Sequence, residues 1–415
     1  MRILVISQYF WPENFRINDL VTEFAARGHD VTVLTGYPNY PSGAVFPEFK
    51  AAPESFARFG EVRVVRVPLL PRGQGGLRLM LNYASFAASA TLLGAWRLRK
   101  ETYDVIFVFE PSPITVGLPA AFLRYLKRAP VAFWVLDLWP ETLEAVGVVR
   151  SKAILNAVGK LVSFIYDRCD LILAQSRSFI PQISKYCRKD GNVQYFPSWS
   201  DSTFDFEQVE AAPEVPAGPG HFDIMFAGNI GEAQDFPAII EAATLLKEND
   251  RIRWLIVGDG RASEWVKSEI QKRGLEHRVF MLGRYPVERM PSFYKCADAL
   301  LVSLRDEPIF SMTIPGKLQS YLAAGIPVLA MLNGEGADIV EKSGAGLACP
   351  AGNGAALAEA ALNLSRMSAE DRHIMGARGI ELSKTEFDRD RLISKLLSWF
   401  DDLVADSRLH KVGTK

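Results

Sequence analysis

The chain has 415 residues, of which 48% are hydrophobic and 23% charged, with a formal net charge of −1. The length favours two domains, and the balanced charge excludes a general nucleic-acid-binding protein. The four cysteines lie far apart without metal-ligand spacing, which argues against a zinc site or a disulfide framework and favours a reducing compartment. The first strand, residues 3–6, is too short to be the core of a signal peptide.

Short β-branched runs alternate with helical patterns through the first half of the chain. RILVIS, a helix over residues 18–26 and VTVLTG predict a β-α-β unit at the start. Further strands are predicted over residues 62–67, 105–109, 131–136 and 171–174. The pattern is typical of an α/β fold with a parallel sheet covered on both faces. Ligands bind such sheets at the carboxyl ends of the strands, where the loops are WPENFR, YPNYPSG, EPSP and DLWPE.

A polar stretch with several Pro and Gly, residues 207–220, has the composition of a linker, and the α/β pattern then restarts. FDIMFAGNIG repeats the plan of the first strand and its loop, and WLIVGDG, VFMLG and ALLVSL follow with helices between them. We therefore predict two Rossmann-like domains facing a central cleft, residues 1–200 and 201–384. Apolar residues at helical spacing predict that a C-terminal helix, residues 385–405, packs back onto the first domain.

A possible anion site lies in SLRDEPIFSMTIPGKLQSYLAAGIPVLA, residues 303–330, which has the pattern of a strand end, a loop, a helix and a second strand. Pro315 suits the first helical turn, because its missing N–H would be unpaired there, and Gly316 lets a ligand approach the backbone. The N–H groups of that turn, the helix dipole and Lys317 suit a phosphate or diphosphate. An ordinary helix between two strands is the alternative.

Eight motifs follow one another over nearly the whole chain: QYFWPENFRINDL, GHDVTVLTGYPNYPSG, FEPSPITVGLPA, FWVLDLWPET, FAGNIGEAQDF, IVGDGR, LGRYP and TIPGKLQSYLAAGIPVLA. In this order they resemble the family 4 retaining glycosyltransferases of the GT-B fold, in the branch that includes fucosamine transferases of bacterial polysaccharide assembly. The resemblance implies an enzyme of the hexosyltransferase type. Its first domain would bind the acceptor, and its second domain would bind the nucleotide of the sugar donor.

The resemblance places Gly228, Asn229 and Gly231 under the donor diphosphate. Two glycines beside an Asn at a strand end allow backbone N–H groups to face an anion, and a tight structural turn is the alternative. Related enzymes often carry Arg and Lys just after this loop, but the corresponding stretch here has no cation. Lys317 and Arg305 are therefore our candidates for neutralising the diphosphate. A solvated position at a strand end is the alternative for Arg305.

The pair of glutamates with which such enzymes contact the donor sugar and the ribose is missing, because Met312 and Ser320 occupy the two positions. Ser320 remains a candidate for binding a ribose hydroxyl, and Thr313 a candidate for the diphosphate. The expected place also has no DxD-type metal motif. Enzymes of this kind generally rely on cations and helix dipoles rather than Mg²⁺, so we expect neither a metal nor another cofactor.

The first half departs from the family at the motif WVLDLWP, where many relatives carry a His before the Asp and this chain has Leu136 before Asp137. Asp137 is our candidate catalytic carboxylate, suited to orient a donor hydroxyl, stabilise an oxocarbenium-like charge or accept the acceptor's proton. An N-cap or turn role is the alternative. Glu110 follows a similar strand and is the second candidate. Enzymes of this kind are thought to react on one face of the sugar, with the leaving diphosphate helping to deprotonate the acceptor.

Three residues of the first half are predicted to contact the acceptor. Asn14 and Arg16 lie in the loop WPENFR, and Arg16 suits a phosphate, with a surface salt bridge as its alternative. Asn39 in YPNYPSG suits a sugar hydroxyl or a turn. Residues 71–100 are about as long as a membrane span, but their Asn, Ser, Thr and Ala favour a buried helix. Their basic flanks favour docking on anionic lipid.

The sequence thus predicts transfer of a sugar from a nucleotide sugar, foremost a UDP-sugar, to a polyprenyl-diphosphate-linked or saccharide acceptor in bacterial cell-surface polysaccharide synthesis. We expect a cytoplasmic enzyme, peripheral on the inner face of the cell membrane. Two other classes stay open. A non-catalytic scaffold in a membrane biosynthetic complex is suggested by Leu136, Met312 and Ser320. A nucleotide-sugar epimerase or hydrolase would need acid and base groups, yet no His lies in a cleft motif.

Overall fold

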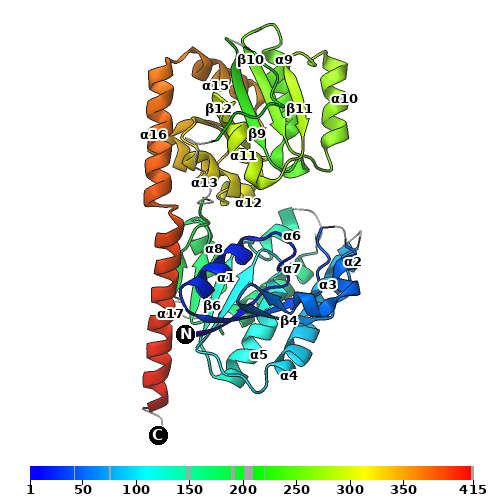
Figure 1. Ribbon diagram of the computed structural model, residues 1–415, viewed down its shortest axis with the longest axis vertical. Helices are drawn as coiled ribbons and strands as arrows, with labels where there is room; N and C mark the ends of the chain where they lie inside the picture. Colours follow the sequence, from blue (N-terminus) through cyan, green and yellow to red (C-terminus); the bar gives the residue numbers. More distant parts are fainter. Residues whose placement is uncertain are drawn as a thin grey trace. The chain divides into compact units, whose positions relative to one another are not determined.

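The computed structural model describes residues 1–41, 43–73, 76–145, 149, 151–187, 192–200, 209–218 and 220–412. The chain divides into two compact units, each built around one β-sheet (Figure 1). The first unit comprises Met1–Phe196 with Ile393–Lys415, and the second comprises Pro197–Leu392. Part of the predicted linker, residues 207, 208 and 219, lies outside the described residues.

The first unit holds an eight-stranded sheet in the order β3-β4-β2-β1-β5-β6-β7-β8. Its strands are β1 (Arg2–Ile6), β2 (Asp30–Gly36), β3 (Arg58–Phe59), β4 (Val62–Val67), β5 (Val105–Glu110), β6 (Val131–Val135), β7 (Leu171–Ala174) and β8 (Val193–Tyr195). All neighbouring pairs are parallel except the short edge pair of β3 and β4. Parallel pairing directs the carboxyl ends of β1, β2, β5 and β6, and therefore their loops, to one edge of the sheet.

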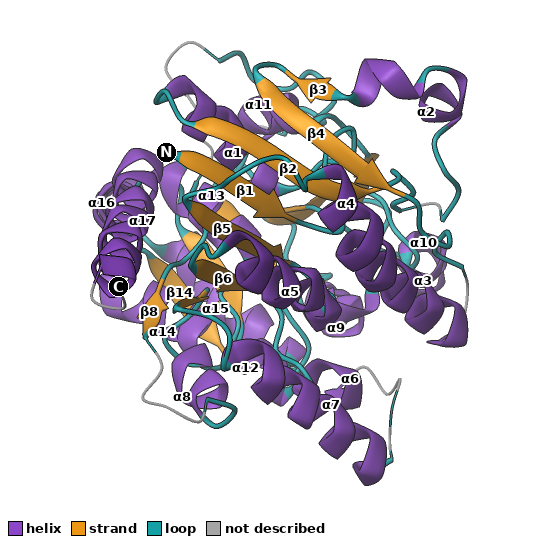
Figure 2. Cartoon of the chain, turned by 90° about the horizontal axis from the view of Figure 1, so that it is seen from below, coloured by secondary structure: helices purple, strands orange, loops and turns teal. Residues whose placement is uncertain are grey.

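Helices cover both faces of this sheet (Figure 2). They are α1 (Arg16–Ala26), α2 (Pro47–Ala51), α3 (Gly76–Ser89), α4 (Ala95–Arg97), α5 (Gly117–Lys127), α6 (Glu141–Ala145), α7 (Lys152–Tyr166), α8 (Phe179–Ser184) and α17 (Arg389–Val412), with a π-helical turn (Ala90–Gly94) joining α3 to α4. Asn82 of α3 is buried and bonds to Gln8 and to the Leu70 carbonyl oxygen. The described part of the apolar stretch, α3 with the π-helical turn and α4, therefore packs onto the first unit.

α17 covers one face of the first sheet together with α1. Ile393, Leu396 and Phe400 are fully buried along it. The Phe400 ring lies 5.9 Å from the ring of Phe24 in α1 and 5.5 Å from that of Phe107 in β5, centroid to centroid. The first unit is thus built from both ends of the chain.

The second unit holds a six-stranded sheet in the order β11-β10-β9-β12-β13-β14, and all of its pairs are parallel. Its strands are β9 (Phe222–Ala227), β10 (Ile252–Val257), β11 (Val279–Gly283), β12 (Ala299–Ser303), β13 (Val328–Met331) and β14 (Gly346–Cys349). Its helices are α9 (Phe236–Leu245), α10 (Ser263–Arg273), α11 (Met290–Tyr294), α12 (Pro308–Ser311), α13 (Gly316–Ala323), α14 (Glu335–Ser343), α15 (Gly354–Arg366) and α16 (Ala369–Thr385). The strand order reverses beside β9, which is where such sheets bind ligands.

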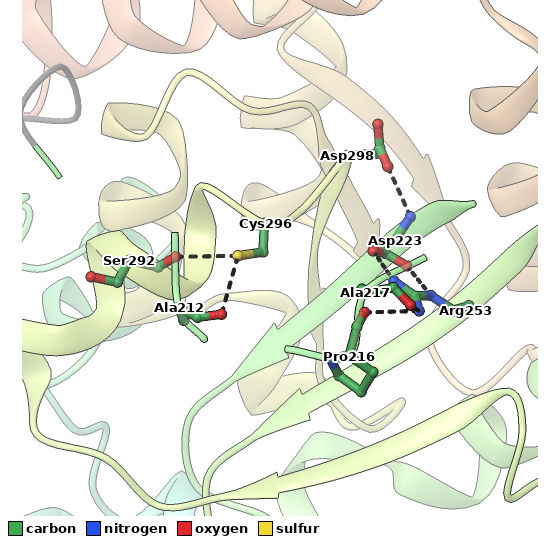
Figure 3. Close-up of polar contacts among 8 residues, drawn as sticks. All are labelled: Ala212, Pro216, Ala217, Asp223, Arg253, Ser292, Cys296 and Asp298. Atoms are coloured by element: carbon green, nitrogen blue, oxygen red, sulfur yellow. Dashed lines mark hydrogen bonds and ion pairs between the residues drawn. The ribbon is translucent and has the colours of Figure 1, made fainter. Parts of the chain in front are cut away.

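The described part of the predicted linker, residues 209–218, is held against the second unit (Figure 3). The Arg253 guanidinium donates to the Pro216 carbonyl oxygen over 3.0 Å and forms a buried ion pair with Asp223 at 2.6 Å. The Cys296 thiol donates to the Ala212 carbonyl oxygen over 3.9 Å. This segment is therefore packed on the second unit, although its composition is that of a linker.

Candidate active site

The loops after β9 and β10 lie against each other, and both turn at glycines. Gly228 and Gly258 each have a φ of 143°, which side chains rarely adopt. A Cβ atom on Gly258 would lie 1.8 Å from the carbonyl oxygen of Gly228. The N–H of Ile230 donates to the carbonyl oxygen of Asp259 over 3.0 Å. The two loops therefore form one close-packed backbone surface at the carboxyl edge of the second sheet.

Two N–H groups that the sequence analysis assigned to a ligand donate to acceptors within the fold instead. The Gly228 N–H donates to the Val257 carbonyl oxygen over 2.8 Å, and the Gly231 N–H donates to the Gln234 side chain over 3.2 Å. The N–H groups of Gly228 and Gly231 are therefore used within the fold, sideways to β10 and to the loop's own turn, and the assignment of this loop to the diphosphate stays a prediction. Asn229, which is exposed between the two glycines, remains a candidate.

Replacing Gly258 with Ala is expected to lower the free energy of unfolding by about 2–3 kcal/mol, because the methyl group displaces Gly228 and the backbone is strained. Gly283→Ala is the matched control. Its φ is 86°, but no atom lies within 4 Å of the added methyl, so only strain of roughly 1 kcal/mol is expected. Calorimetric unfolding of both variants measures the difference. Equal losses would mean that the contact with Gly228 contributes nothing.

α13 begins at Gly316, and Pro315 precedes it as the N-cap residue with φ −62° and ψ 130°. We expected Pro315 inside the first turn. It lies one position earlier, because its carbonyl oxygen accepts the N–H of Leu318 over 2.9 Å while its own ψ stays extended. Gly316 is exposed, and no atom lies within 4 Å of where its Cβ would be. The first turn of α13 is thus open to a ligand.

The Lys317 side chain extends from this turn to the glycine loop. Its Nζ lies 3.6 Å from the centroid of the Phe226 ring and 3.0 Å from the position of a Cβ on Gly228. Nζ is buried and has no hydrogen-bond partner among the described residues, and burial lowers the pKa of Lys317 to about 7. Tyr321, one turn further, bonds through its hydroxyl to both the N–H and the carbonyl oxygen of Ala227. A buried ammonium without a hydrogen-bond partner is unfavourable. An anion bound at this loop would therefore be attracted by the charge of Lys317 and would stabilise it.

Three further donor candidates lie near this turn. The Thr313 hydroxyl donates to the Ile309 carbonyl oxygen over 2.9 Å, so it is used within the fold. Ser320 is buried in α13, with 9% of its surface exposed. Arg305 is exposed after β12, and its backbone N–H donates to the Ala233 carbonyl oxygen over 2.9 Å. Of the predicted cations, Lys317 reaches the glycine loop with its Nζ, whereas Arg305 is exposed and its charge acts on Asp235, just after that loop.

In the first unit, a carboxylate that the sequence interpretation did not select joins the loops after β1 and β2. Glu13 is 4% exposed and accepts the N–H groups of Phe10 over 3.1 Å and of Asn39 and Tyr40 over 2.7 Å each. Burial raises the pKa of Glu13, while these N–H groups and the charge of Arg66 oppose the rise. The sequence feature that could have pointed to Glu13 is an acidic residue within the otherwise aromatic loop WPENF.

Glu13→Ala is expected to lower the free energy of unfolding by about 2–3 kcal/mol, because three N–H groups at these loops lose their acceptor. Urea denaturation measures the loss. Glu48→Ala, at an exposed position of α2, is the matched control and should change stability by less than about 0.5 kcal/mol. If Glu13→Ala is as stable as the control, water replaces the carboxylate and the loops do not depend on it.

The predicted acceptor residues belong to these two loops. Asn39 is fully buried, its amide donates to the Tyr37 carbonyl oxygen over 2.9 Å, and its side-chain oxygen accepts the N–H of Arg72 over 3.2 Å. The structure thus gives Asn39 the turn role that was its alternative. Asn14 is exposed, and Arg16 is half-buried at the start of α1.

The two candidate catalytic carboxylates follow neighbouring strands. Glu110 ends β5, is fully buried, and its carboxylate oxygens have no hydrogen-bond partner among the described residues. Burial, together with the nearby charge of Asp137, raises the pKa of Glu110 well above its usual range. Asp137 is only half-buried, and it accepts the Thr142 hydroxyl over 2.5 Å and the Trp139 indole N–H over 3.1 Å. Asp137 therefore holds its own turn and is also the more accessible of the two.

Two hydroxyl groups that sequence reasoning missed lie beside these carboxylates. Tyr83 of α3 packs its ring 6.1 Å from that of Trp139, and burial raises the pKa of its phenol. Burial also raises the pKa of Asp137, and Ser112 lies close enough to Tyr83 and to Asp137 to oppose the rise of both pKa values. Ser112 has a φ of 137°, which is unusual for a residue other than glycine. The motif EPSP contained Ser112, but nothing in its pattern singled it out.

Two family models match the chain. Residues 14–199 match "Glycosyl transferase 4-like domain", and residues 221–367 match "Glycosyl transferases group 1". The chain is a glycosyltransferase of the family 4 type. Among curated relatives, the putative colanic acid biosynthesis glycosyl transferase WcaI of Escherichia coli K12 is 28% identical over 343 residues, which cover 78% of this chain and 82% of WcaI.

Solved structures place this glycosyltransferase in the GT-B fold. Sucrose-phosphate synthase of Thermosynechococcus elongatus aligns with a TM-score of 0.72 and 16% identity over 98% of this chain and 99% of that one. HepE of Anabaena, solved with UDP and glucose, aligns with a TM-score of 0.67 and 16% identity over 97% and 99% of the two chains. The prediction of two Rossmann-like domains of the GT-B class is confirmed by these likenesses.

Among the residues that the structure describes, no three His, Cys, Asp or Glu side chains are grouped so that they could hold a metal ion. No helix in the described part of the chain is both long enough and apolar enough to cross a membrane.

Proposed function

We propose that this glycosyltransferase is a retaining enzyme that moves a sugar from a nucleotide-diphosphate sugar, foremost a UDP-sugar, to a polyprenyl-diphosphate-linked or saccharide acceptor in bacterial cell-surface polysaccharide synthesis. The observation that carries the donor assignment is the buried, unpartnered ammonium of Lys317 beside the open first turn of α13. The name of WcaI, which refers to colanic acid biosynthesis, supports a polysaccharide product. The complex of HepE with UDP and glucose supports a uridine donor.

The second unit binds the donor in this proposal. The diphosphate lies at the first turn of α13, where the N–H groups of Gly316 and Lys317 have no acceptor within the helix and the helix dipole favours an anion. Lys317 meets the charge that grows on the leaving diphosphate, so no metal ion is needed for this role. Ser320 and Asn229 are the remaining polar candidates for the ribose and the diphosphate.

The first unit binds the acceptor, and the reaction takes place on one face of the sugar. The bond from the anomeric carbon to the diphosphate oxygen breaks, and a bond from that carbon to the acceptor oxygen forms. The leaving diphosphate takes the electron pair of the broken bond and accepts the acceptor's proton. Asp137 stabilises the positive charge that develops at the anomeric carbon. We place the enzyme in the fucosamine-transferase-like branch because the motif order resembles that branch.

Calorimetric titration of the purified chain with UDP, GDP and ADP tests the donor assignment, first with a chelator and then with Mg²⁺. We expect micromolar binding of UDP, weaker binding of GDP and ADP, and no dependence on Mg²⁺. Selective binding of GDP or ADP would replace uridine in the proposal. No binding of any diphosphate would contradict the donor site itself.

A lipid-linked acceptor would place the enzyme in the cytoplasm, at the inner face of the cell membrane. The basic, apolar stretch 71–100 supports this placement, because it folds as α3, the π-helical turn and α4 with Leu92 and Trp96 exposed. Exposed apolar side chains among basic ones are typical of proteins that lie on anionic membranes.

A further inference from the structure

Most of the exposed large apolar side chains belong to the helices on one face of the first sheet. They account for ten of the seventeen such side chains among the described residues. The ten are Met80 and Leu81 of α3, Leu92 and Leu93 of the π-helical turn, Trp96 of α4, Phe122, Tyr125 and Leu126 of α5, and Ile154 and Phe164 of α7. Tyr125 is 84% exposed, Leu92 69% and Trp96 61%. Exposed apolar side chains that are gathered on one face are typical of an interaction surface, whereas singly scattered ones are common on any protein.

An apolar groove of about 620 Å³ runs between these helices. It is lined by Ala88 and Leu92 on one side, Leu118 and Phe122 of α5 along its floor, and Phe164 of α7 on the other side. Figure 2 shows α3, α4, α5 and α7 on the same side of the first sheet. The exposed side chains of these helices and the groove therefore belong to the same side of the first sheet, and we call this surface the helical face.

The helical face is basic. The segments that form it, from α3 through α4, α5 and α7, contain no Asp or Glu. Their exposed cations, with those that directly follow α4 and α5, are Arg78, Arg97, Arg99, Lys100 and Arg128, while an exposed acid, Asp167, directly follows α7. Lys152 and Lys160 of α7 line a different pocket, beside Glu141 and Glu144. Arg99 covers the Trp96 ring at 4.3 Å from its centroid, which joins a cation to an exposed aromatic ring. The absence of Asp and Glu within α3, the π-helical turn, α4, α5 and α7 stands out because the whole chain carries 48 Asp and Glu.

We infer that the helical face docks on a bilayer that contains anionic phospholipid, with Leu92, Trp96 and Tyr125 in the interfacial layer and hydrocarbon in the groove. The inference deepens the proposed function, on which it rests, by naming the surface that contacts the membrane. Apolar side chains with Trp and Tyr suit the boundary between headgroups and acyl chains, and the cations suit the anionic headgroups. A second copy of the chain is a poorer occupant, since it would bring the same cations together.

The groove also leads toward the carboxyl edge of the first sheet. Thr115 lines it and lies in the 3-10 turn Ile114–Val116, five residues after Glu110, the second candidate catalytic carboxylate. From there the groove continues along α5 to Tyr125, a distance of about 15 Å at the rise of an α-helix. A sugar on a membrane-embedded polyprenyl diphosphate would therefore lie at the carboxyl edge of the first sheet while its lipid stays in the bilayer.

Sedimentation with vesicles tests the inference on the full chain. The probes are vesicles of phosphatidylcholine alone and vesicles with about 30% phosphatidylglycerol. We expect at least tenfold tighter binding to the anionic vesicles, and at least fivefold weakening at 0.5 M salt, because each exposed cation near the surface contributes through screened attraction. Equal binding to both kinds of vesicle, or binding to neither, would overturn the inference.

Variants locate the surface. The double variant Leu92→Ser with Trp96→Ser, and separately Tyr125→Ser, should weaken binding to anionic vesicles at least fivefold. The matched control is Leu245→Ser with Trp265→Ser in the second unit, whose side chains are 58% and 42% exposed, and it should bind as the unaltered chain does. Because all these positions are exposed, the substitutions should leave the fold intact. Thermal unfolding at an unchanged temperature verifies this for each variant. Unchanged vesicle binding by both face variants would overturn the inference.

Two readouts separate this inference from the proposed function. Vesicle binding is measured without donor or acceptor, and UDP titration of the Leu92→Ser, Trp96→Ser variant is measured without vesicles. UDP binding should be unchanged in that variant. Loss of vesicle binding with intact UDP binding supports the surface, whereas a chain that binds vesicles but no nucleotide contradicts the proposed function alone. A dimer that these substitutions dissociate would assign the face to a second copy and overturn the inference.

Discussion

Replacing Lys317 with Met is expected to weaken binding of the nucleoside diphosphate about 10- to 100-fold at pH 6.5 while making the protein more stable. The loss in affinity corresponds to a hydrogen bond between charged groups, roughly 1.5–3 kcal/mol. The gain in stability arises because Met fills the same volume without burying an ammonium that has no hydrogen-bond partner, a cost that exceeds the attraction of the Phe226 ring for that ammonium. Titration with UDP and thermal unfolding measure the two effects on the same sample.

The pH dependence of donor affinity provides a second readout of the same residue. In the free protein the pKa of Lys317 is about 7, and a bound diphosphate would raise it. Affinity should therefore be constant below pH 7, where Lys317 is charged before and after binding. Above pH 7 it should fall by about tenfold per pH unit, because binding then requires uptake of a proton. Lys317→Met should remove this slope.

Lys317 also determines whether the free energy of unfolding rises or falls with pH. The folded pKa of Lys317 lies below its unfolded value of 10.5, so between pH 7 and 10.5 the unfolded chain binds more protons and stability should rise with pH. Lys342→Met, at a largely exposed position of α14, is the matched control for all three measurements. If both variants bind UDP as the unaltered chain does, Lys317 does not meet the diphosphate.

Asp137→Asn is expected to lower turnover about 10²- to 10³-fold while donor affinity stays within about twofold, because the charge acts only as the anomeric carbon becomes positive. The substitution keeps the shape of the side chain. Steady-state transfer rates and UDP titration separate the two quantities. Glu110→Gln should reduce turnover much less, because Glu110 is fully buried away from solvent and burial raises the pKa of its carboxyl.

Thr142→Val is the control that distinguishes catalysis from support of the turn. It removes the hydrogen bond to Asp137, which is 2.5 Å long, but leaves the carboxylate in place. If it slows transfer as much as Asp137→Asn does, the aspartate acts through its turn and the catalytic assignment is wrong. A modest effect of Thr142→Val beside a large effect of Asp137→Asn supports a direct role.

The order of strands and helices was predictable because it depends on local patterns. Runs such as RILVIS and FDIMFA are apolar and β-branched over single strands, and parallel sheets then place the following loops at one edge. The same patterns accordingly predict Glu110, Asp137 and Lys317 at strand ends or helix starts. Each of them lies at the carboxyl edge of its own sheet.

The missed features depend on contacts between distant segments. Whether the N–H of Gly228 is available is decided by the loop at Gly258, thirty residues away, and no spacing within FAGNIG reveals this. Glu13 acts on Asn39 across two separate loops. The helical face combines α3 with α5 and α7, so the stretch 71–100 indicated only one part of it.

The return of α17 to the first unit has a consequence for biosynthesis. The apolar strip formed by Phe24 and Phe107 is made early, but its partner Phe400 leaves the ribosome some 290 residues after Phe107. During translation this strip has no native cover, and such transiently exposed apolar surface is what chaperones recognise. A nascent chain stalled before residue 393 would therefore remain a chaperone client, however completely its second unit had folded.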